Sequence, residues 1–533
     1  MPDPLAPEGT LYSWFRNSAR RHPEATAIEV AGEAVRYREL LDLVERLASR
    51  LVEAAGQRAA GSGRPPAAVG LLAGRSLAGY AGYLAALRLG ATAVPLSPEA
   101  PASRIAWTCQ QSGVDVVLVD RAGAGGRELA GRTGVATLTL EAAAGRPWYW
   151  SLDAPPWPEP YPGRPEDVAY LLFTSGSTGV PKGVPIRHRN LGPLLEHCID
   201  QYALGSASRF GQASDLTFDG SVFGTFATWC AGGTLVVPQP EELLAPPQLA
   251  SSRRLTHWYS VPSVISFARR SGMLAAASMP ELRWSFFGGE QLTVAQARAW
   301  AAAAPGSVIG NLYGPTEVTV TCAEYLLPPD PAHWPVTRNG TVPIGPVLPH
   351  LESLILAGDG TAGAEGELCV RGPQRFDGYL DPEHDRGQFV HFDGQRARPH
   401  DGSAPPASAW YRTGDRVCTG PDGALVHLGR LDDQLQIRGH RVEPGEVEST
   451  LRGHPAILDV VVLATADRAG LQAVYTGRPV PAGELAALAA EWLPPYLRPQ
   501  QYRWIEQLPV NHNGKVDRRR LATELPAPPV PPG

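Results

Sequence analysis

Residues 170–184, Tyr170-Leu-Leu-Phe-Thr-Ser-Gly-Ser-Thr-Gly-Val-Pro-Lys-Gly-Val184, form the most informative segment of this chain. An apolar run that is typical of a buried strand leads into six consecutive Thr, Ser and Gly residues, and a lysine follows. Such a loop can turn several backbone N–H groups and hydroxyls toward one point, which suits a polyphosphate ligand. The GxxxxGK[ST] spacing of a Walker A loop is absent. The segment therefore predicts a phosphate-binding loop of a different kind.

Lysine usage draws attention to the same loop. Of the 47 basic residues, only Lys182 and Lys515 are lysines. A position that keeps lysine in an arginine-rich chain can require a compact ammonium charge rather than a planar guanidinium. Lys182 follows the loop directly, so it either binds phosphate or braces the loop.

The segments on either side of the loop predict an α/β protein. Helical and short apolar strand-like segments alternate from about residue 10 to 150, which is typical of βαβ units on a parallel sheet. A second α/β block follows to about residue 345, and a mainly β region extends from about 351 to 428. We therefore expect a large N-terminal domain of α/β subdomains plus a β-rich subdomain, and a small mobile α+β C-terminal domain.

Composition excludes several functional classes. With 47 basic and 53 acidic side chains and no large basic cluster, the chain is not expected to bind nucleic acid. Six scattered cysteines without a CxxC pair predict reduced thiols in a cytoplasmic protein. The apolar stretch 77–96 contains Arg88 and then Gly90-Ala-Thr-Ala-Val-Pro95, so it predicts a buried helix and a strand rather than a membrane span.

Residues 358–363 match the GxGxxG pattern of dinucleotide-binding proteins. A strand-like segment follows them, whereas dinucleotide binding requires a helix whose N-terminus faces the pyrophosphate. The segment is therefore predicted to be a hairpin turn.

Four further motifs accompany the phosphate loop: Asn311-Leu-Tyr-Gly-Pro-Thr-Glu317, Tyr411-Arg-Thr-Gly-Asp415, Gly429-Arg-Leu-Asp-Asp-Gln-Leu-Gln-Ile-Arg-Gly439 and Asn513-Gly-Lys-Val-Asp-Arg518. With them, the sequence resembles the adenylate-forming (acyl-CoA synthetase and luciferase) superfamily. It is most similar to the amino-acid adenylation domains of nonribosomal peptide synthetases. The similarity runs in order along nearly the whole chain.

In that family an amino acid and Mg-ATP give an aminoacyl adenylate, and the acyl group then passes to the phosphopantetheine thiol of a carrier protein. The resemblance implies ATP and Mg²⁺ as cofactors, Lys515 as the catalytic lysine, Thr316 as a phosphate contact and Glu317 as the Mg²⁺ ligand. Tyr313 would stack on adenine, and Asp415 would accept hydrogen bonds from the ribose. The nucleotide-binding positions implied in this way are Thr174, Ser175, Gly176, Ser177, Thr178, Gly179, Lys182, Gly288, Gly289, Glu290, Asn311, Tyr313, Asp415 and Arg430.

Phe218-Asp-Gly-Ser221 indicates which acid is activated. In amino-acid-activating members the Asp at this place, here Asp219, pairs with the substrate α-ammonium. A fatty or aryl acid would leave a buried carboxylate unpaired, so an acyl- or aryl-CoA ligase of the same superfamily is the weaker alternative. The other interpretation of Asp219 is a helix N-cap.

The side-chain pocket implied by the resemblance is largely apolar, which disfavours charged substrates and favours a small or branched aliphatic L-amino acid: Val, 2-aminobutyrate, Ile, Ala or Thr. The three aromatic rings of Phe223, Tyr259 and Phe286 would narrow it. Its positions are Phe218, Asp219, Gly220, Phe223, Tyr259, Phe286, Gly288, Leu312, Val320, Thr321 and Lys515.

The resemblance also implies a domain organisation, with an adenylation core over residues 1–431, a C-terminal lid over 432–533 and a hinge near Asp432. Gln436 departs from the family, which often has lysine at this place. No carrier attachment motif follows Lys515. We expect either a freestanding enzyme that loads a holo carrier protein in trans or an excised domain, and a small activator protein is a further candidate partner. A non-catalytic binding protein on this fold is the remaining alternative, which the matching catalytic positions oppose.

Overall fold

The computed structural model describes residues 9–56, 65–123, 131–140, 147–176, 179–465, 467–509, 516 and 518–524. Contacts between residues divide the chain into two compact units. The larger unit comprises Met1–Pro98, Ala106–Phe173 and Gly183–Leu431. The smaller unit comprises Glu99–Ile105, Thr174–Lys182 and Asp432–Gly533. The phosphate loop therefore belongs to the same unit as the C-terminal segment.

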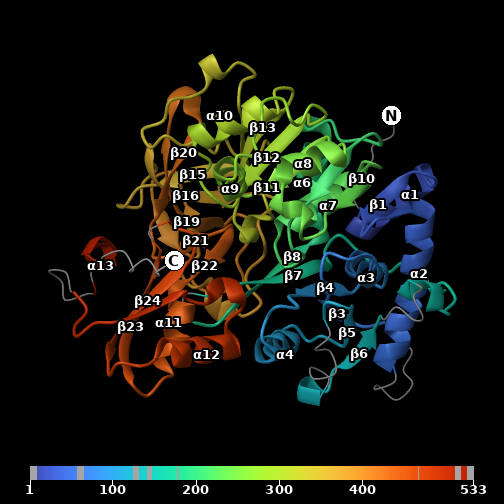
Figure 1. Ribbon diagram of the computed structural model, residues 1–533, viewed down its shortest axis with the longest axis horizontal. Helices are drawn as coiled ribbons and strands as arrows, with labels where there is room; N and C mark the ends of the chain where they lie inside the picture. The colour runs from blue at the N-terminus through green and yellow to red at the C-terminus, as the bar shows by residue number, and fades with distance from the viewer. Residues whose placement is uncertain are drawn as a thin grey trace. The chain divides into compact units, whose positions relative to one another are not determined.

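An eight-stranded sheet of the larger unit has the order β14-β13-β12-β11-β9-β10-β1-β2, with parallel strands inside and an antiparallel strand at each edge. Helix α7 packs against β9 and β10, and also against α1 and α6 (Figure 1). The strands are β1 (Thr26–Val30), β2 (Glu33–Arg36), β9 (Arg209–Gln212), β10 (Thr234–Val237), β11 (His257–Ser260), β12 (Trp284–Gly288), β13 (Val308–Tyr313) and β14 (Ala323–Leu326). The helices are α1 (Leu11–Arg21), α6 (His188–Gln201), α7 (Gly220–Cys230), α8 (Pro246–Ser252), α9 (Ser263–Arg270) and α10 (Val294–Ala303).

A second sheet has the order β6-β5-β3-β4-β7-β8. The apolar stretch 77–96 forms the buried helix α3, which packs on β3 and β4, and then strand β4, as expected. No helix in the described part of the chain is both long and apolar enough to cross a membrane. The elements are β3 (Ala68–Leu72), β4 (Thr92–Leu96), β5 (Val116–Val119), β6 (Ala136–Thr139), β7 (Val168–Thr174), β8 (Lys182–Arg187), α2 (Tyr37–Gly56), α3 (Leu77–Arg88) and α4 (Ala102–Gln111).

The region from residue 352 onward forms a β-rich sheet of order β15-β16-β19-β17-β18, with β20 paired to β19. Strands β15 and β16 are antiparallel, with Leu356 opposite Glu367, so residues 358–363 form the predicted hairpin connection. The strands are β15 (Glu352–Leu356), β16 (Glu365–Arg371), β17 (Phe389–Phe392), β18 (Ala397–Pro399), β19 (Trp410–Thr419) and β20 (Leu425–Arg430).

The smaller unit contains a two-stranded hairpin and a three-stranded sheet. Together with the larger unit, this arrangement confirms the expected α/β class with a β-rich subdomain and a small α+β C-terminal part. The elements are β21 (Leu435–Ile437), β22 (His440–Val442), β23 (Ile457–Ala464), β24 (Leu471–Gly477), β25 (Gln501–Trp504), α11 (Pro444–Arg452), α12 (Ala482–Trp492) and α13 (Arg518–Glu524). Short 3₁₀ turns are η1 (Trp148–Ser151), η2 (Glu242–Leu244), η3 (Thr316–Val318), η4 (Pro331–His333), η5 (Pro382–Asp385), η6 (Pro421–Gly423) and η7 (Pro495–Leu497).

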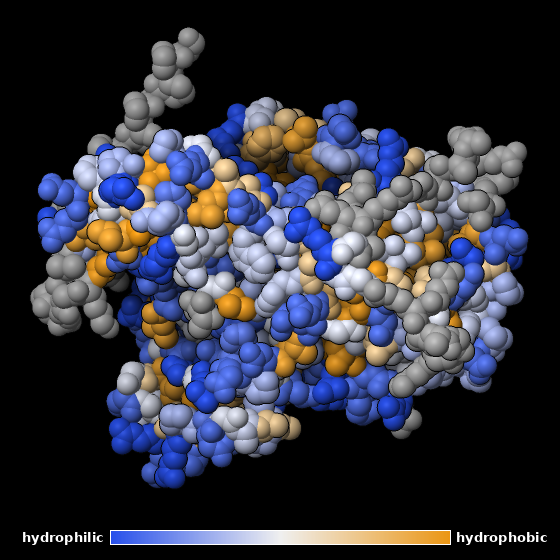
Figure 2. All heavy atoms as spheres, turned by 90° about the horizontal axis from the view of Figure 1, so that it is seen from below, coloured by the Kyte–Doolittle hydropathy of each residue, from blue (hydrophilic) through white to orange (hydrophobic). Residues whose placement is uncertain are grey.

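Apolar side chains are buried in separate clusters within each unit. The face in Figure 2 is mainly hydrophilic, with apolar residues in small separate groups. All six cysteines lie in the described ranges and none is in a disulfide; five are buried, and Cys418 on β19 is half-buried. The expectation of free thiols is therefore confirmed.

Candidate functional site

Asp219 lies immediately before helix α7, where the chain already has helical dihedral angles. Asp219 thus occupies the N-cap position, as the alternative interpretation expected, but its carboxylate makes no capping bond to the helix. Instead Oδ2 accepts a hydrogen bond of 2.8 Å from the hydroxyl of Thr316. Asp219 is only 8% exposed. Two residues predicted from separate motifs therefore meet at one buried carboxylate.

The three predicted aromatic residues cluster. The ring of Phe223 lies 5.6 Å from that of Tyr259 and 6.0 Å from that of Phe286. Gly220 and Gly288 allow this packing: a Cβ at Gly220 would lie 2.6 Å from the Tyr259 ring, and one at Gly288 would lie 2.9 Å from the Leu312 carbonyl oxygen. The sequence motifs therefore identified both the rings and the glycines that make room for them.

Tyr202 is a member of this cluster that sequence reasoning missed. Its ring lies 4.3 Å from Phe286, and its hydroxyl donates a 2.6 Å hydrogen bond to Glu324. Burial, and then the neighbouring Cys198 and Glu324, raise the pKa of Tyr202 well above its usual value. No local motif marks Tyr202, because its role comes from packing of α6 against distant strands.

Glu317 lies in the 3₁₀ turn η3 and is fully buried. The hydroxyl of Tyr379 donates a 2.6 Å hydrogen bond to its Oε1, and the N–H of Phe376 donates to its backbone carbonyl at 2.9 Å. Tyr379 was not among the residues predicted from the sequence. The turn continues through Thr319 and Val320, whose φ angles are 56° and 67°. Left-handed backbone at two adjacent β-branched residues is strained by about 1–3 kcal/mol each.

Asp415 accepts hydrogen bonds from two side chains and forms an ion pair with a third. The Tyr313 hydroxyl lies 2.6 Å from Oδ2, His427 Nε2 lies 2.9 Å from Oδ1, and the Arg430 guanidinium lies 3.2 Å from Oδ1. Burial alone would raise the pKa of Asp415, but the hydrogen bond from His427 and the charge of Arg430 outweigh it and lower the pKa to about 2. His427, which sequence reasoning missed, thus helps to keep Asp415 ionised.

Other predicted nucleotide positions in the larger unit bond to the backbone. The Asn311 amide donates to the carbonyl oxygens of Val342 at 3.1 Å and Pro343 at 2.8 Å. Glu290 accepts a 2.8 Å hydrogen bond from the N–H of Ser263. Gly289 has φ of 77°, which glycine adopts without strain.

The phosphate loop is bonded within the smaller unit. The Ser175 hydroxyl donates to the carbonyl of Arg441 at 2.8 Å and accepts from the N–H of Glu443 at 3.0 Å. The carboxylate of Glu446 is fully buried and pairs with Arg104; burial raises its pKa, and Arg104 and the N–H of Gly176 oppose this shift. The loop therefore already has oxygen atoms of its own chain against its polar groups.

Other predicted loop residues vary in their placement. The Thr174 hydroxyl is buried without a hydrogen-bond partner among the described residues, Gly179 has φ of 87°, and Lys182 is buried at the start of β8. Ser177, Thr178 and Lys515 lie outside the described residues. An orphaned hydroxyl on a loop of this composition is suited to a phosphate oxygen.

The residues fit a magnesium ion bound together with ATP. Among the described residues, no group of three or more His, Cys, Asp or Glu side chains could hold a metal without help. Mg²⁺ is commonly bound through one or two carboxylates plus substrate phosphates, and Glu317 supplies one buried carboxylate.

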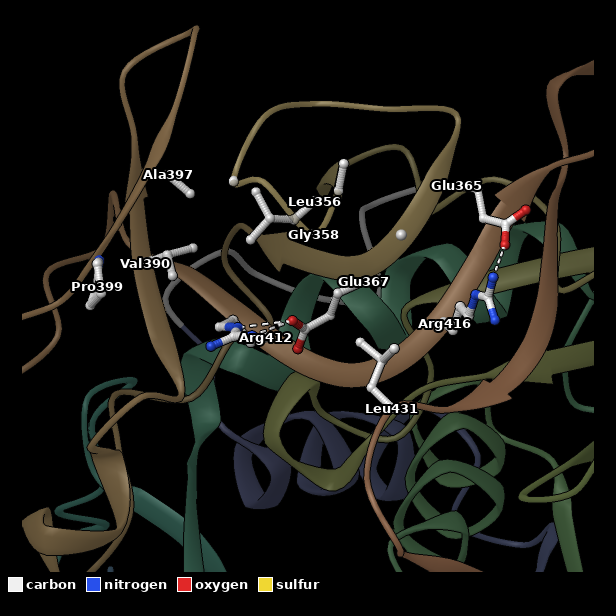
Figure 3. Close-up of a pocket in the computed structure, with 13 residues that line it drawn as sticks. Leu356, Gly358, Glu365, Glu367, Val390, Ala397, Pro399, Arg412, Arg416 and Leu431 are labelled. Carbon is white, nitrogen blue, oxygen red and sulfur yellow. Dashed lines mark hydrogen bonds and ion pairs between the residues drawn. The ribbon is translucent and has the colours of Figure 1, made fainter. Parts of the chain in front are cut away.

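A cavity of about 560 Å³ lies elsewhere, against strands β15 to β19. Its charged side chains already pair: Arg412 with Glu367 at 2.6 Å, and Arg416 with Glu365, with Leu431 between the two pairs (Figure 3). None of the predicted site residues lines it. Its charges are therefore satisfied within the β-rich sheet.

Together the buried Asp219, the Glu317 turn and the Asp415 cluster, with the fold that carries them, define an adenylate-forming enzyme. The chain belongs to the AMP-binding enzyme family, whose model matches residues 15–380.

Two curated relatives illustrate the similarity. Phosphinothricin tripeptide synthetase PhsC of Streptomyces viridochromogenes is 34% identical over 97% of this chain, which spans only 45% of that protein's length. The L-proline–[L-prolyl-carrier protein] ligase of Pseudomonas fluorescens is 32% identical over 97% of this chain and 99% of its own.

Solved structures show the same relationship. IdnL7 is 38% identical, with a TM-score of 0.68 over 96% of this chain and 98% of that one. The Vibrio cholerae adenylation domain AlmE, solved with glycyl-adenosine-5'-phosphate, is 26% identical, with a TM-score of 0.77 over 96% of this chain and 97% of its own. The adenylation-domain resemblance inferred from the sequence is therefore confirmed.

Proposed function

We propose that this enzyme activates a small or branched aliphatic L-amino acid (Val, 2-aminobutyrate, Ile, Ala or Thr) as an aminoacyl adenylate and then transfers it to the phosphopantetheine thiol of a carrier protein. The observation that carries the proposal is the buried Asp219 carboxylate beside an aromatic cluster. A carboxylate in such surroundings is stabilised by a cationic partner, and the α-ammonium of an amino acid supplies one.

The composition of the pocket supports an uncharged side chain. Phe223, Phe286, Leu312 and Val320 are all at most 5% exposed and apolar. A charged substrate side chain would lose its hydration there without a partner. Thr321 and the Tyr259 hydroxyl add two polar groups, which keeps threonine among the candidates.

For the adenylation step, Mg²⁺ held by Glu317 and the ATP phosphates would screen negative charge as the substrate carboxylate approaches the α-phosphate. Asp415, ionised through its contacts with His427 and Arg430, would accept hydrogen bonds from the ribose. Tyr313 would stack on adenine, and Thr174 to Gly179 would bind the β- and γ-phosphates. Lys515 would bind the substrate carboxylate and phosphate oxygens. Lys182 would either bind phosphate or brace the loop.

For the transfer step, we propose a core over residues 1–431 and a lid over residues 432–533 that rotates about Asp432. A division of contacts between Leu431 and Asp432 supports this boundary. The curated relative matched over 99% of its length is named a carrier protein ligase, which supports a carrier supplied as a separate chain.

The test is amino-acid-dependent ATP–pyrophosphate exchange across the common amino acids and 2-aminobutyrate, comparing wild type, Lys515→Ala and the control Arg520→Ala. We expect exchange with a small aliphatic amino acid, lost in Lys515→Ala and kept in Arg520→Ala. Exchange with fatty or aryl acids alone would overturn the proposal in favour of a CoA ligase. Absence of exchange with every acid, with and without added activator protein, would also overturn it.

A further inference from the structure

The wall of the amino-acid pocket includes a strained turn. Val320 and Thr321 follow η3 after the intervening Thr319, and both Thr319 and Val320 have left-handed φ angles. β-Branched side chains are unfavourable in this region, so the turn persists only because surrounding groups hold it. The position of the Val320 side chain therefore depends on whatever fixes this turn.

Gln374 is the group that fixes it. This residue lies after β16, is fully buried, and its Nε2 donates to the carbonyl oxygens of Val318 at 3.1 Å, Thr319 at 3.2 Å and Thr321 at 2.8 Å. In return, the hydroxyl of Thr319 donates to the backbone carbonyl oxygen of Gln374 at 2.6 Å. One side-chain amide thus bonds to the carbonyl groups of three residues of the turn.

The orientation of this amide is set from its other side. Because Nε2 faces three carbonyls, Oε1 faces His350 and accepts a hydrogen bond from the ring Nε2–H of that residue. The His350 ring contacts the His197 ring, and His197 pairs with Glu324 at 2.8 Å. Glu324 also accepts from Tyr202, the residue packed against Phe286. The turn and the aromatic side of the pocket therefore share one polar support.

We propose that Gln374 is a positioning residue that sets the side-chain selectivity of the amino-acid pocket. This inference rests on the proposed function, since Val320 and Thr321 are assigned to the pocket there. Without the amide donors, the carbonyls of Val318 and Thr321 lose this partner, that of Thr319 keeps the N–H of Thr321, and the turn relaxes away from its left-handed geometry. Val320 then moves, and the pocket no longer distinguishes side chains that differ by one methylene.

The nucleotide side should be less affected. Glu317 precedes the clamped residues, and Tyr379 and Phe376 hold its side chain and backbone independently of the Gln374 amide. Loss of the clamp should therefore separate the response to the amino acid from the response to ATP.

The experiment measures pyrophosphate-exchange kinetics for the best amino acid and for the analogues one methylene smaller and larger, together with the KM for ATP. The variants are Gln374→Ala and Gln374→Met, which fills the same volume without N–H donors. Thr319→Val removes only the reciprocal hydroxyl bond and serves if the Gln374 variants do not fold. The control is Gln296→Ala, which removes an amide bonded to Thr293, Ser266 and Pro262 in the capping region of α10.

We expect selectivity, as the ratio of kcat/KM values, to fall roughly 10-fold in both Gln374 variants and by a smaller factor in Thr319→Val. The KM for ATP should change less than 3-fold, and Gln296→Ala should keep the wild-type ratio. A ratio of kcat/KM values does not change with the fraction of folded enzyme, so lost stability alone cannot produce this result. If Gln374→Met retains the wild-type selectivity, Gln374 acts only by filling space. That result would overturn this inference but not the proposed function. Absence of amino-acid-dependent exchange in wild type would overturn the proposed function, and this inference with it.

Discussion

The amino-acid pocket and the phosphate loop satisfy their polar groups in opposite ways. In the pocket, the Asp219 carboxylate accepts a hydrogen bond from the Thr316 hydroxyl, and Gly220 leaves room for the Tyr259 ring. In the loop, the Ser175 hydroxyl donates to the carbonyl of Arg441 on β22 and accepts from the N–H of Glu443. We therefore expect the pocket to be formed in advance and the loop to exchange internal hydrogen bonds for those of a phosphate.

The largest expected effect lies in the pocket. Asp219→Asn keeps the shape of the side chain and removes the charge, so the substrate ammonium loses its partner in a buried site. We expect kcat/KM for the amino acid in pyrophosphate exchange to fall by roughly 10²–10³-fold, corresponding to the ~3–5 kcal/mol typical of a broken buried pair. Asp215→Asn is the control, because the Asp215 carboxylate accepts its hydrogen bonds from Thr217 in the local turn. In this variant kcat/KM for the amino acid should fall less than 5-fold. Equal losses in the two variants would contradict a specific role for Asp219.

A pH-dependent loss of stability should also originate near the pocket. His257 bridges Thr256 and the Tyr202 carbonyl, and burial lowers its pKa to about 4, although the bond to Tyr202 opposes the shift. Because the unfolded state takes up a proton near pH 6.5 and the folded state only near pH 4, this site favours folding above pH 6.5. This contribution to the free energy of unfolding is lost as the pH falls between those values. From pH 7.5 to pH 5 the loss is about 2 kcal/mol.

Thermal melts at pH 7.5 and pH 5 test this. The wild-type midpoint should fall on acidification, and His257→Gln should be less stable at pH 7.5 but show a smaller fall. His391→Gln, at an exposed position, should behave as wild type. An identical pH response in wild type and His257→Gln would refute the assignment.

The smallest expected effect concerns the loop. In Glu446→Gln the carboxylate beside the Gly176 N–H loses its charge, so it attracts this N–H less and leaves it more available to phosphate. We expect the KM for ATP to fall about 2–5-fold, within the range of one weakened hydrogen bond. Glu448→Gln is a matched control on the same helix, because Glu448 is buried and pairs with Arg518 away from the loop. An unchanged or higher KM for ATP in Glu446→Gln would show that the loop needs no release.

The sequence predicted what is encoded locally. The helix and strand of residues 77–96 and the hairpin at 358–363 each depend on neighbouring residues, so a short pattern sufficed. Gln374 and Tyr202 could not be found in this way. Their partners lie far along the chain, and the choice among many buried amides and hydroxyls is made by packing.

Backbone conformation and the grouping of segments could not be predicted from the sequence either. The residue types of Thr319 and Val320 do not indicate left-handed dihedral angles, since both disfavour them. Likewise, residues 99–105 and 174–182 associate with the C-terminal segment through contacts such as Arg104 with Glu446, which no local pattern reveals. A buried ion pair depends on where the fold brings two charges together.

The distribution of the thiols has a practical consequence for fluorescence work. Burial raises the pKa of Cys109 to about 12 and raises the pKa of four other buried cysteines, so these thiols stay protonated and shielded. Cys418 alone among the six is partly exposed, and it follows Asp415 on the same strand. A maleimide dye should therefore attach at Cys418 in the natural protein, without removal of the other cysteines, and label the strand that carries Asp415.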